Sequence, residues 1–503
     1  ANLSSTLMDE ALFIQLSASY TDRNSQLGFN EAFRYAISTN PTAPVRAEDA
    51  PFAFNTEKYG GFFETLGLFD FFNPKAIVEL NDRNGKLQVL STAAFLRYDI
   101  KPALSLNFRY AYQDLFANER AYYPPQSYFR GNPFFVIPER SGRADLNDYA
   151  DEFSLYEVFT NYKKTLGKSK LGLSLGYAYQ DGNYLQNDLR LYGFSNEEVL
   201  EVKRIEDYQT WMEEAMLFDT VNIGWSNKLA AFFGRMNFNL QDKLIVNASL
   251  RYEGSSKLGE NKRWGFFPGL GMALNLDKML DIPAFEWLKI RAGYGITGSI
   301  PQTGGLSQAK IVLVEQDDGS FIEEFDWVAN PDLKWEEKRE VNLGLDFRIG
   351  QLEGHVDWYN RSVTDWINRN YFDFSNIYVN QNALNSTGVE LNLSLRLFEN
   401  QKSAYHIVIF FSTSQTKFGE LEISPSYAVG VGGFVQNPPI GIQEEEPIGD
   451  IFALIFQTVN IDGGPEFEDI NQDGNVVTDI YGIFEPESDF RVIGNGFTNF
   501  ELG

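Results

Sequence analysis

The sequence of 503 residues contains no cysteine and only two histidines, His355 and His406. The absence of cysteine excludes disulfides, thiolate metal sites and a cysteine nucleophile. The two histidines do not have the spacing of a zinc-binding pair, and no Ser-His-Asp order is present. Carboxylates are so numerous that no single pair can be assigned to glycoside hydrolysis. We therefore expect a protein that is not an enzyme.

Basic charge is also scarce, because 42 Lys and Arg stand against 69 Asp and Glu, for a formal net charge of −27. Binding to nucleic acid requires a basic surface, so the composition excludes it as a partner. Much of the acidic excess lies between the segments predicted to be strands, for example in residues 197–214 and 315–326. These acidic stretches are typical of solvated loops.

The chain has no run of eighteen or more apolar residues, so no transmembrane helix is expected. Instead, apolar and polar residues alternate along many segments. In residues 244–252, Leu244, Val246 and Leu250 lie on one side of the pattern, while Asn247 and Arg251 lie on the other. A period of two is typical of a β-strand, because successive side chains leave a sheet on opposite faces. Segments of about ten such residues that end in Tyr or Trp are typical of strands in outer-membrane β-barrels.

The connections between these segments alternate between short and long, as in a membrane barrel with short periplasmic turns and long extracellular loops. Each segment carries a whole apolar face that only lipid could cover, so the sheet has to close on itself. The sequence therefore predicts an all-β fold, a transmembrane antiparallel β-barrel over residues 1–503. The strands are predicted near residues 12–20, 87–113, 153–180, 228–253, 266–296, 339–360 and 388–414, and the long extracellular loops near 114–152, 181–227, 297–338, 361–387 and 415–497.

Several motifs follow one another between Lys228 and Leu397. They are Arg251–Pro268, Leu288–Gly298, Asn330–Glu337, Trp358–Arg361 and Leu384–Glu390. Together and in this order, these motifs resemble the SusC-like family of TonB-dependent outer-membrane transporters.

The resemblance implies a barrel of the 22-stranded type with an N-terminal plug, of which this chain is expected to be the barrel portion without the plug and the last strands. It implies a cell outer membrane location with contact to outer-membrane lipid. It also implies import of oligosaccharides or peptides, with a SusD-like surface lipoprotein and TonB as partners. The alternative is a barrel of this family that serves as a structural subunit of a larger envelope complex without transport of its own.

Two short motifs suggest ligand sites. Asp469, Asn471 and Asp473 place oxygen side chains at alternate positions before a glycine, which suits calcium, although Ile480 stands where a bidentate Glu is expected. The alternative is a turn rich in Asp and Asn, and no other cofactor is expected. Gly293–Gly298 matches the dinucleotide fingerprint by letter, but Pro301 follows instead of a helix, so a strand end is the better interpretation.

Aromatic residues in the predicted loops could stack on sugar rings or contact a partner protein. We favour packing of the loops themselves for most of them. They are Tyr122, Tyr123, Phe129, Phe134, Phe135, Trp211 and Trp327.

Overall fold

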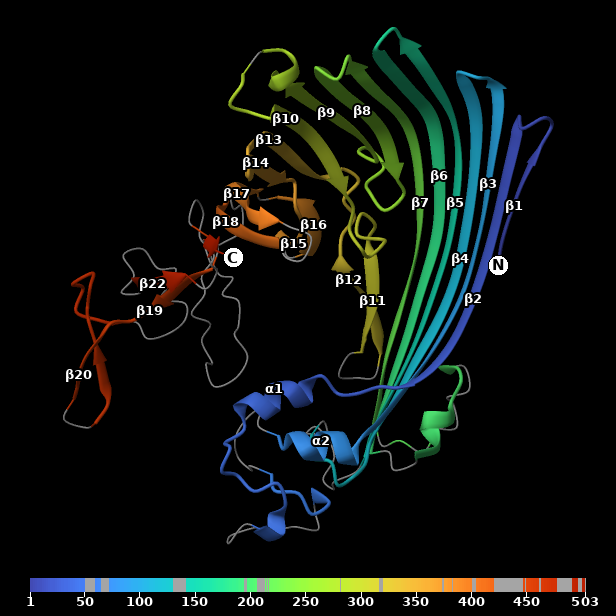
Figure 1. Cartoon of the computed structure of the whole chain (residues 1–503). Coiled ribbons are helices and arrows are strands. Elements are labelled where there is room, and N and C mark those ends of the chain that lie inside the picture. The colour runs from blue at the N-terminus through green and yellow to red at the C-terminus, as the bar shows by residue number, and fades with distance from the viewer. Residues whose placement is uncertain are drawn as a thin grey trace. The chain divides into compact units, whose positions relative to one another are not determined.

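A sheet of fifteen strands holds most of the described residues (Figure 1). Each strand pairs with the strands next to it in the sheet order, which follows the order of the chain except where β11–β12, β15–β16 and β19–β22 lie outside this sheet. The computed structural model describes residues 1–49, 59–64, 72–129, 142–193, 197–205, 213, 215, 217–280, 282–315, 320–372, 375–381, 383–399, 404–419, 447, 449–460, 463–476, 491–495 and 500–502. None of the described helices is long and apolar enough to cross a membrane.

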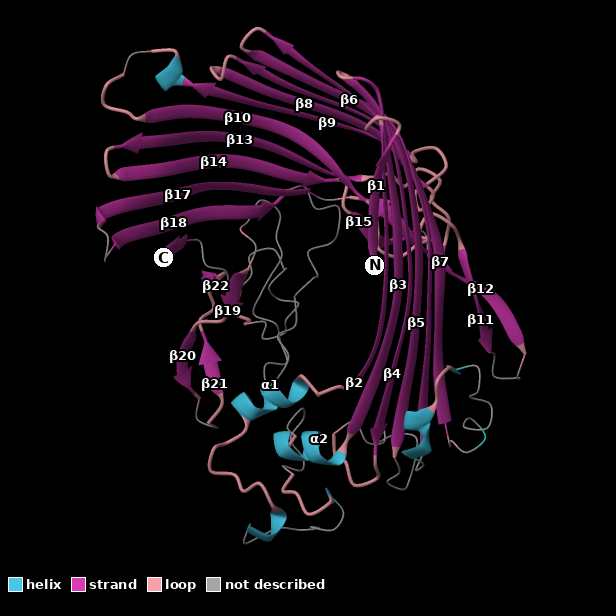
Figure 2. Ribbon diagram, turned by 45° about the vertical axis from the view of Figure 1, so that its right-hand side comes forward, coloured by secondary structure: helices cyan, strands magenta, loops and turns pink. Residues whose placement is uncertain are grey.

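Most strands of this sheet are long, and alternating short and long connections join them (Figure 2). They are β1 (Asn2–Leu7), β2 (Leu12–Gln26), β3 (Asp82–Lys101), β4 (Leu104–Tyr123), β5 (Arg143–Leu166), β6 (Ser169–Tyr192), β7 (Leu217–Leu240), β8 (Leu244–Ser255), β9 (Trp264–Asn275), β10 (Trp287–Ser299), β13 (Glu336–Ile349), β14 (Leu352–Thr364), β17 (Ala383–Glu399), β18 (Ala404–Phe418) and β23 (Phe500–Leu502).

Four small hairpin-like sheets and a few helices lie in the long connections. The strand pairs are β11 (Lys310–Glu315) with β12 (Phe321–Trp327), β15 (Ile367–Phe372) with β16 (Ser375–Asn380), β19 (Asp450–Ala453) with β22 (Arg491–Asn495), and β20 (Phe456–Val459) with β21 (Pro465–Phe467). The helices are α1 (Glu31–Ser38), α2 (Pro74–Leu80) and short 3₁₀ turns at Ala47–Asp49, Glu197–Glu201 and Leu276–Lys278.

The chain divides into two compact units. Unit 1 contains residues 1–96, 108–156 and 180–227, and unit 2 contains residues 97–107, 157–179 and 228–503. In unit 1, α1 and α2 lie beyond the ends of β2 and β3 that are remote from the β1–β2 turn (Figure 1). In unit 2, β10, β13, β14, β17 and β18 lie side by side (Figure 2).

Strands extend well into the regions predicted as the long loops 114–152 and 181–227, so those boundaries were wrong. β4 continues to Tyr123, β5 begins at Arg143, β6 continues to Tyr192 and β7 begins at Leu217. Beyond a lipid layer, a strand needs no apolar face, so alternation fades from the sequence while the backbone ladder goes on. The loops predicted at 297–338, 361–387 and 415–497 likewise contain the β11–β12, β15–β16, β19–β22 and β20–β21 pairs.

The chain also has elements before and after the predicted first strand. β1 precedes it, and its residues Asn-Leu-Ser-Ser-Thr-Leu show no alternation, which is why the sequence did not reveal it. Within residues 21–86, which show no clean pattern, α2 begins at a proline and is capped by Asn73, whose side chain accepts hydrogen bonds from the amides of Lys75 and Ala76. Proline at the first helical turn with an Asn cap is a favoured helix start.

Candidate functional site

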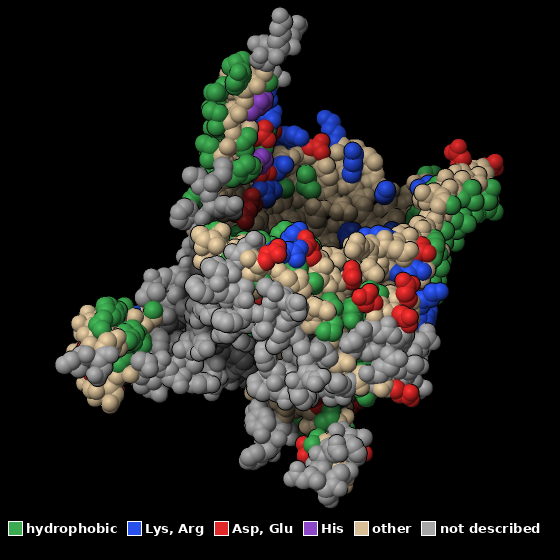
Figure 3. Space-filling view, turned by 90° about the horizontal axis from the view of Figure 1, so that it is seen from below, with side chains coloured by type: hydrophobic (Ala, Val, Ile, Leu, Met, Phe, Trp, Pro, Cys, Tyr) green, Lys and Arg blue, Asp and Glu red, His purple; other side chains and the backbone are tan. Residues whose placement is uncertain are grey.

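The two faces of the sheet in unit 2 differ sharply in chemistry. On one face of β7, β8, β9, β10 and β13, large hydrophobic side chains are exposed: Phe232 by 55%, Leu250 by 52%, Leu270 by 46%, Ile290 by 43% and Leu343 by 49%. Within the part of the chain that the structure describes, no second sheet packs on these side chains. The space-filling view shows hydrophobic side chains on one surface of the wall and charged side chains on the other (Figure 3). Such exposure is the expected arrangement for a lipid-facing surface.

A charged network lies on the opposite, polar face of β10, β13 and β14. Arg291 donates to both oxygens of Asp346 at 2.7–3.0 Å and to both oxygens of Asp357 at 2.9 and 3.0 Å. Strand register brings the three together, because Arg291 is opposite Gly344 and Gly344 is opposite Asp357. A fork-shaped guanidinium that satisfies two carboxylates is a rigid, charge-assisted arrangement.

The network continues through His355 on β14. Its Nδ1 lies 3.2 Å from Asp346, and its Nε2 lies 3.5 Å from Glu353. Arg348 in turn donates to Glu353 at 2.5 Å. The ring of Trp287 lies 6.0 Å from the ring of His355. The polar face therefore carries balanced, mutually oriented charges rather than an isolated histidine.

Gly344 makes room for this network. A Cβ added at Gly344 would lie 2.5 Å from the guanidinium carbon of Arg291, which four partner oxygens hold in place. We expect Gly344→Ala to lower the free energy of unfolding by about 1–3 kcal/mol, the usual cost of overpacking a fixed side chain. Urea unfolding of the lipid-reconstituted protein measures the change.

Gly293 is the matched control for this substitution. It faces the same side of the neighbouring strand β10, and a Cβ there would meet only the Cβ of Asn342, at 4.0 Å. Gly293→Ala should therefore leave stability unchanged or raise it slightly, because alanine loses less backbone entropy in a strand. Equal losses in both variants would show that crowding of Arg291 is not the cause.

A groove of about 510 Å³ is lined by residues of β5, β7, β8, β9 and β10. Arg251 forms a two-point ion pair with Glu253 at 2.5 and 2.7 Å along one wall. Arg235 also lines the groove, is exposed, and has no hydrogen bond or ion pair with any residue that the structure describes. The floor includes Gly269 and Gly295, which are paired across β9 and β10. The groove can therefore admit a group close to the backbone, next to an unneutralised guanidinium.

The stretches that carry the family resemblance build the loop ends beside this groove. Lys257 is buried, and its Nζ donates to the carbonyl oxygens of Pro301 at 3.1 Å and Gln302 at 2.5 Å. Trp335 packs on Phe267 with a centroid distance of 5.1 Å and donates its indole N–H to the carbonyl of Arg263 at 2.8 Å. These motif residues therefore join three connections of unit 2 into one packed cluster.

The β11–β12 and β15–β16 hairpins are locked together by Asp326. Its carboxylate accepts from Lys310 at 2.9 Å and from Arg369 at 2.7 Å, and its carbonyl oxygen accepts from Asn376 at 3.0 Å. Beside it, Trp327 meets Tyr378 edge-on at 5.3 Å. Two long connections of the chain thus form one docked module outside the fifteen-stranded sheet.

This docking should weaken in acid. The hydrogen bond from Lys310, followed by the charges of Lys310 and Arg369, holds the pKa of Asp326 below its ordinary value. A lowered pKa in the docked state means that the contribution is present above about pH 4 and is lost as the pH falls through the lowered value. Spin labels on cysteines placed at Glu324 and Asn368 should move apart below that pH.

The chain's lack of native cysteine makes this labelling specific. In Asp326→Asn, the distance between the two labels should no longer depend on pH over this range. A pH-dependent separation that persists in Asp326→Asn would assign the effect to another group.

Residues 9–440, most of the chain, match the family described as TonB dependent receptor-like, beta-barrel. The chain belongs to this family. It is 24% identical over 397 residues to the TonB-dependent receptor SusC of Bacteroides thetaiotaomicron, covering 73% of this chain and 37% of that protein. It is 26% identical over 376 residues to the TonB-dependent receptor P3 of Formosa agariphila, covering 70% of this chain and 36% of that protein.

Among solved structures, the chain resembles the RagAB peptide transporter with a TM-score of 0.68 and 16% identity, covering 91% of this chain and 50% of that one. At this identity, the likeness shows the fold. The chain thus spans about half or less of the length of the proteins it matches. The predicted all-β outer-membrane barrel fold and the SusC-like resemblance are confirmed. In such a barrel, the exposed apolar face meets lipid, and the polar face with Arg291 and the groove lines the lumen.

The calcium prediction remains untested in this TonB-dependent receptor chain. Asp469, Asn471 and Asp473 do form one tight turn, in which Asp469 accepts from the amide of Gly474 at 2.8 Å and Asn471 accepts from the amide of Asp473 at 2.9 Å. Within the described residues, no group of three or more His, Asp or Glu side chains is placed to hold a metal ion. Residue 480 lies outside them. Calcium at this turn stays a prediction.

The other sequence motifs have structural roles. Gly293–Gly298 lies within β10 and is paired with β13, so the strand interpretation is correct. Tyr122 and Tyr123 end strand β4 rather than lying in a loop, and both are buried, as is Phe129. They pack against other hydrophobic side chains, as expected for most of these aromatics. Phe134, Phe135 and Trp211 lie outside the described residues.

Proposed function

We propose that this chain is the barrel portion of an outer-membrane importer that works with a SusD-like surface lipoprotein and draws energy through TonB. The observation that carries the proposal is the two-faced sheet, with an exposed apolar surface and a polar surface that holds the Arg291 network and the groove at Arg235. The similarity to SusC and to the RagAB peptide transporter supports it. A barrel that only anchored other proteins would need no open, charged groove on its inner wall.

The cargo we propose is a peptide or oligosaccharide too large for porins. RagAB is described as a peptide transporter, which favours peptides. The formal net charge of −27 disfavours polyanionic cargo, because like charges repel at the entrance. We expect no catalysis by this chain.

Two measurements on the full-length protein test the proposal. A tagged copy purified from its own outer membrane should retain a surface lipoprotein. Cells that carry it should take up labelled peptides or oligosaccharides, and the uptake should stop when a protonophore collapses the energy supply for TonB. Recovery of assembly or secretion machinery instead of a lipoprotein, with uptake unaffected by deletion of the gene, would contradict import and favour a structural subunit.

A further inference from the structure

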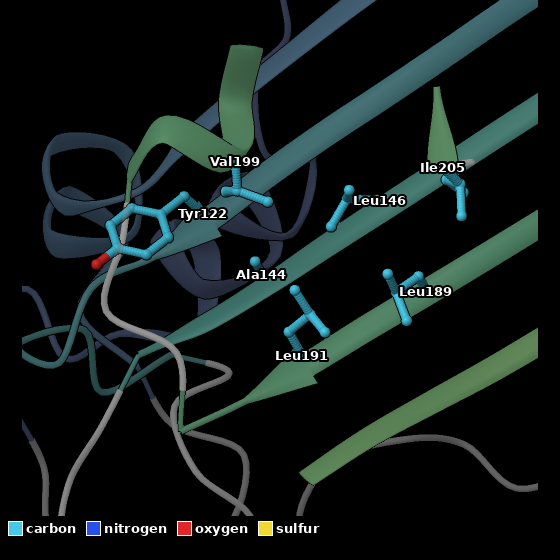
Figure 4. Close-up of a cluster of buried hydrophobic side chains, with 7 residues drawn as sticks. All are labelled: Tyr122, Ala144, Leu146, Leu189, Leu191, Val199 and Ile205. Atoms are coloured by element: carbon cyan, nitrogen blue, oxygen red, sulfur yellow. The ribbon is translucent and has the colours of Figure 1, made fainter. Parts of the chain in front are cut away.

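Residues 197–205, named the strap here, lie on the outward face of β4, β5 and β6 in unit 1. Val199 and Ile205 of the strap pack in a cluster with Leu146, Leu189 and other buried side chains of these strands (Figure 4). Side chains on this face of the strands point away from the polar face, where Tyr123 packs with α1 and α2 residues. The strap therefore covers the outside of the wall.

A buried ion pair fixes the strap. Arg120, which is 2% exposed, donates to the Val202 carbonyl of the strap at 2.7 Å and to Asp148 at 2.6 Å. Asp148 also accepts from the amide of Ile205 at 3.0 Å. The C-terminal half of the strap is therefore tied to the wall through polar groups that are shielded from solvent.

A cavity of about 380 Å³ lies beside the strap. Its apolar lining includes Leu90, Phe116 and Leu185. Arg204 also lines the cavity, and its guanidinium lies 4.9 Å from the centre of the Phe116 ring. Leu90 and Leu185 are 39% and 47% exposed. The cavity floor is therefore continuous with the exposed apolar surface that meets lipid.

The cavity lies at the level where the outward face changes from apolar to polar. On β4, the outward residues Phe108, Tyr110 and Tyr112 give way to Asp114. On β2, Tyr20 of the cavity lies eight residues beyond Leu12, or about 26 Å along the strand at about 3.3 Å per residue. Because strands of such barrels are tilted by about 35–45°, this path spans about 19–22 Å of an apolar band about 25 Å tall, whose border with the headgroups is marked by aromatic residues.

The polar lining of the cavity can still form hydrogen bonds. Asp114 is exposed, and neither it nor Asn187 forms a hydrogen bond or ion pair with any residue that the structure describes. Gln88 donates to the hydroxyl of Tyr20 at 3.2 Å, which leaves its amide oxygen available. A carboxylate, two amides, a guanidinium and aromatic rings together suit a ligand with several hydroxyl groups and an apolar side.

We propose that this cavity binds the sugar headgroup of a glycolipid in the outer leaflet, with its first acyl carbons on Leu90 and Leu185. Asp114 and Asn187 accept and donate hydrogen bonds to the sugar hydroxyls, and Arg204 pairs with an attached phosphate. The strap holds Arg204 over the cavity. Continuity of the floor with the lipid-facing surface selects a membrane lipid rather than a soluble sugar.

Binding of diphosphorylated lipid A to the full-length protein in detergent, followed by native mass spectrometry, tests the proposal. Arg204→Gln and Asp114→Asn should each weaken binding about tenfold, the effect of losing one hydrogen bond to a charged group. The ties of Arg120 and Asp148 to the strap remain in both variants, so both should fold. Lys203→Gln is the matched control, because it removes the same charge from the strap at a position that does not line the cavity.

Phosphatidylglycerol serves as a second probe, because it carries a phosphate without a sugar ring. The proposal expects it to displace lipid A poorly. Equal affinity of Arg204→Gln and the unaltered protein for lipid A would overturn the site. Displacement by phosphatidylglycerol as effective as by lipid A itself would overturn recognition of the sugar.

Discussion

Replacing Leu343 with arginine should lower the free energy of unfolding in a lipid bilayer by about 2–4 kcal/mol. Leu343 is 49% exposed on β13 and lies in the apolar stretch of that strand, with Val341 and Leu345 as its exposed neighbours on the same face. A guanidinium at this position must enter hydrocarbon, where no polar partner is available. The measurement is reversible urea unfolding of the protein in phosphatidylcholine vesicles, followed by tryptophan fluorescence.

Asn342→Arg is the control, because it introduces the same charge on the opposite face of the same strand. Asn342 is the adjacent residue, lies opposite Gly293 on β10, and belongs to the polar face. An arginine there stays in water, so the change should remain within about 0.5 kcal/mol. The assignment of the faces would fail if the two variants lost equal stability, or if Asn342→Arg lost more.

The alternation that predicted the fold was sufficient wherever lipid covers the strand. In Leu244–Tyr252, the face predicted to be apolar carries the exposed Leu250. A strand that faces lipid has an apolar residue at every second position, so its membrane-facing part can be recognised from the sequence. The same reason explains why the strand ends could not be found. Residues 114–123 of β4 lie beyond the apolar band. Without lipid on their outward face, they need no apolar residue at every second position.

The candidate sites could be predicted only in part, because they depend on which strands are neighbours. Arg291 is 55 residues from Asp346 and 66 residues from Asp357 in the sequence. Only the register of β10, β13 and β14 brings the three side chains together. The strand pattern alone does not show that Asp346 and Asp357 face the same arginine. The signal that could have indicated the network is Gly344, a glycine in a strand interior, which often marks a close approach.

Removing the side chain of Arg120 should release the strap at residues 197–205. In Arg120→Met, the carboxylate of Asp148, which is 7% exposed as a residue, would remain buried without its cation. Breaking a buried ion pair from one side costs about 3–5 kcal/mol, which would raise the open population of the strap at least a hundredfold. Trypsin cleavage after Lys203 and Arg204 reports this population when opening is fast compared with cleavage. The initial cleavage rate should therefore rise by at least that factor.

Two further variants test whether the buried ion pair is what holds the strap. Arg190→Met removes another arginine of unit 1, whose side chain is 44% exposed and whose nearest carboxylate contacts are at 3.5 and 3.8 Å. An exposed pair of this kind contributes at most about 1 kcal/mol, so cleavage should change little. The double variant Arg120→Met with Asp148→Leu removes both charges and should recover part of the protection, because a buried pair can be replaced by apolar groups at small cost while the amide of Ile205 loses its acceptor. If the double variant is cleaved as fast as Arg120→Met, the strap is held by the hydrogen bonds at Val202 and Ile205 rather than by the ion pair.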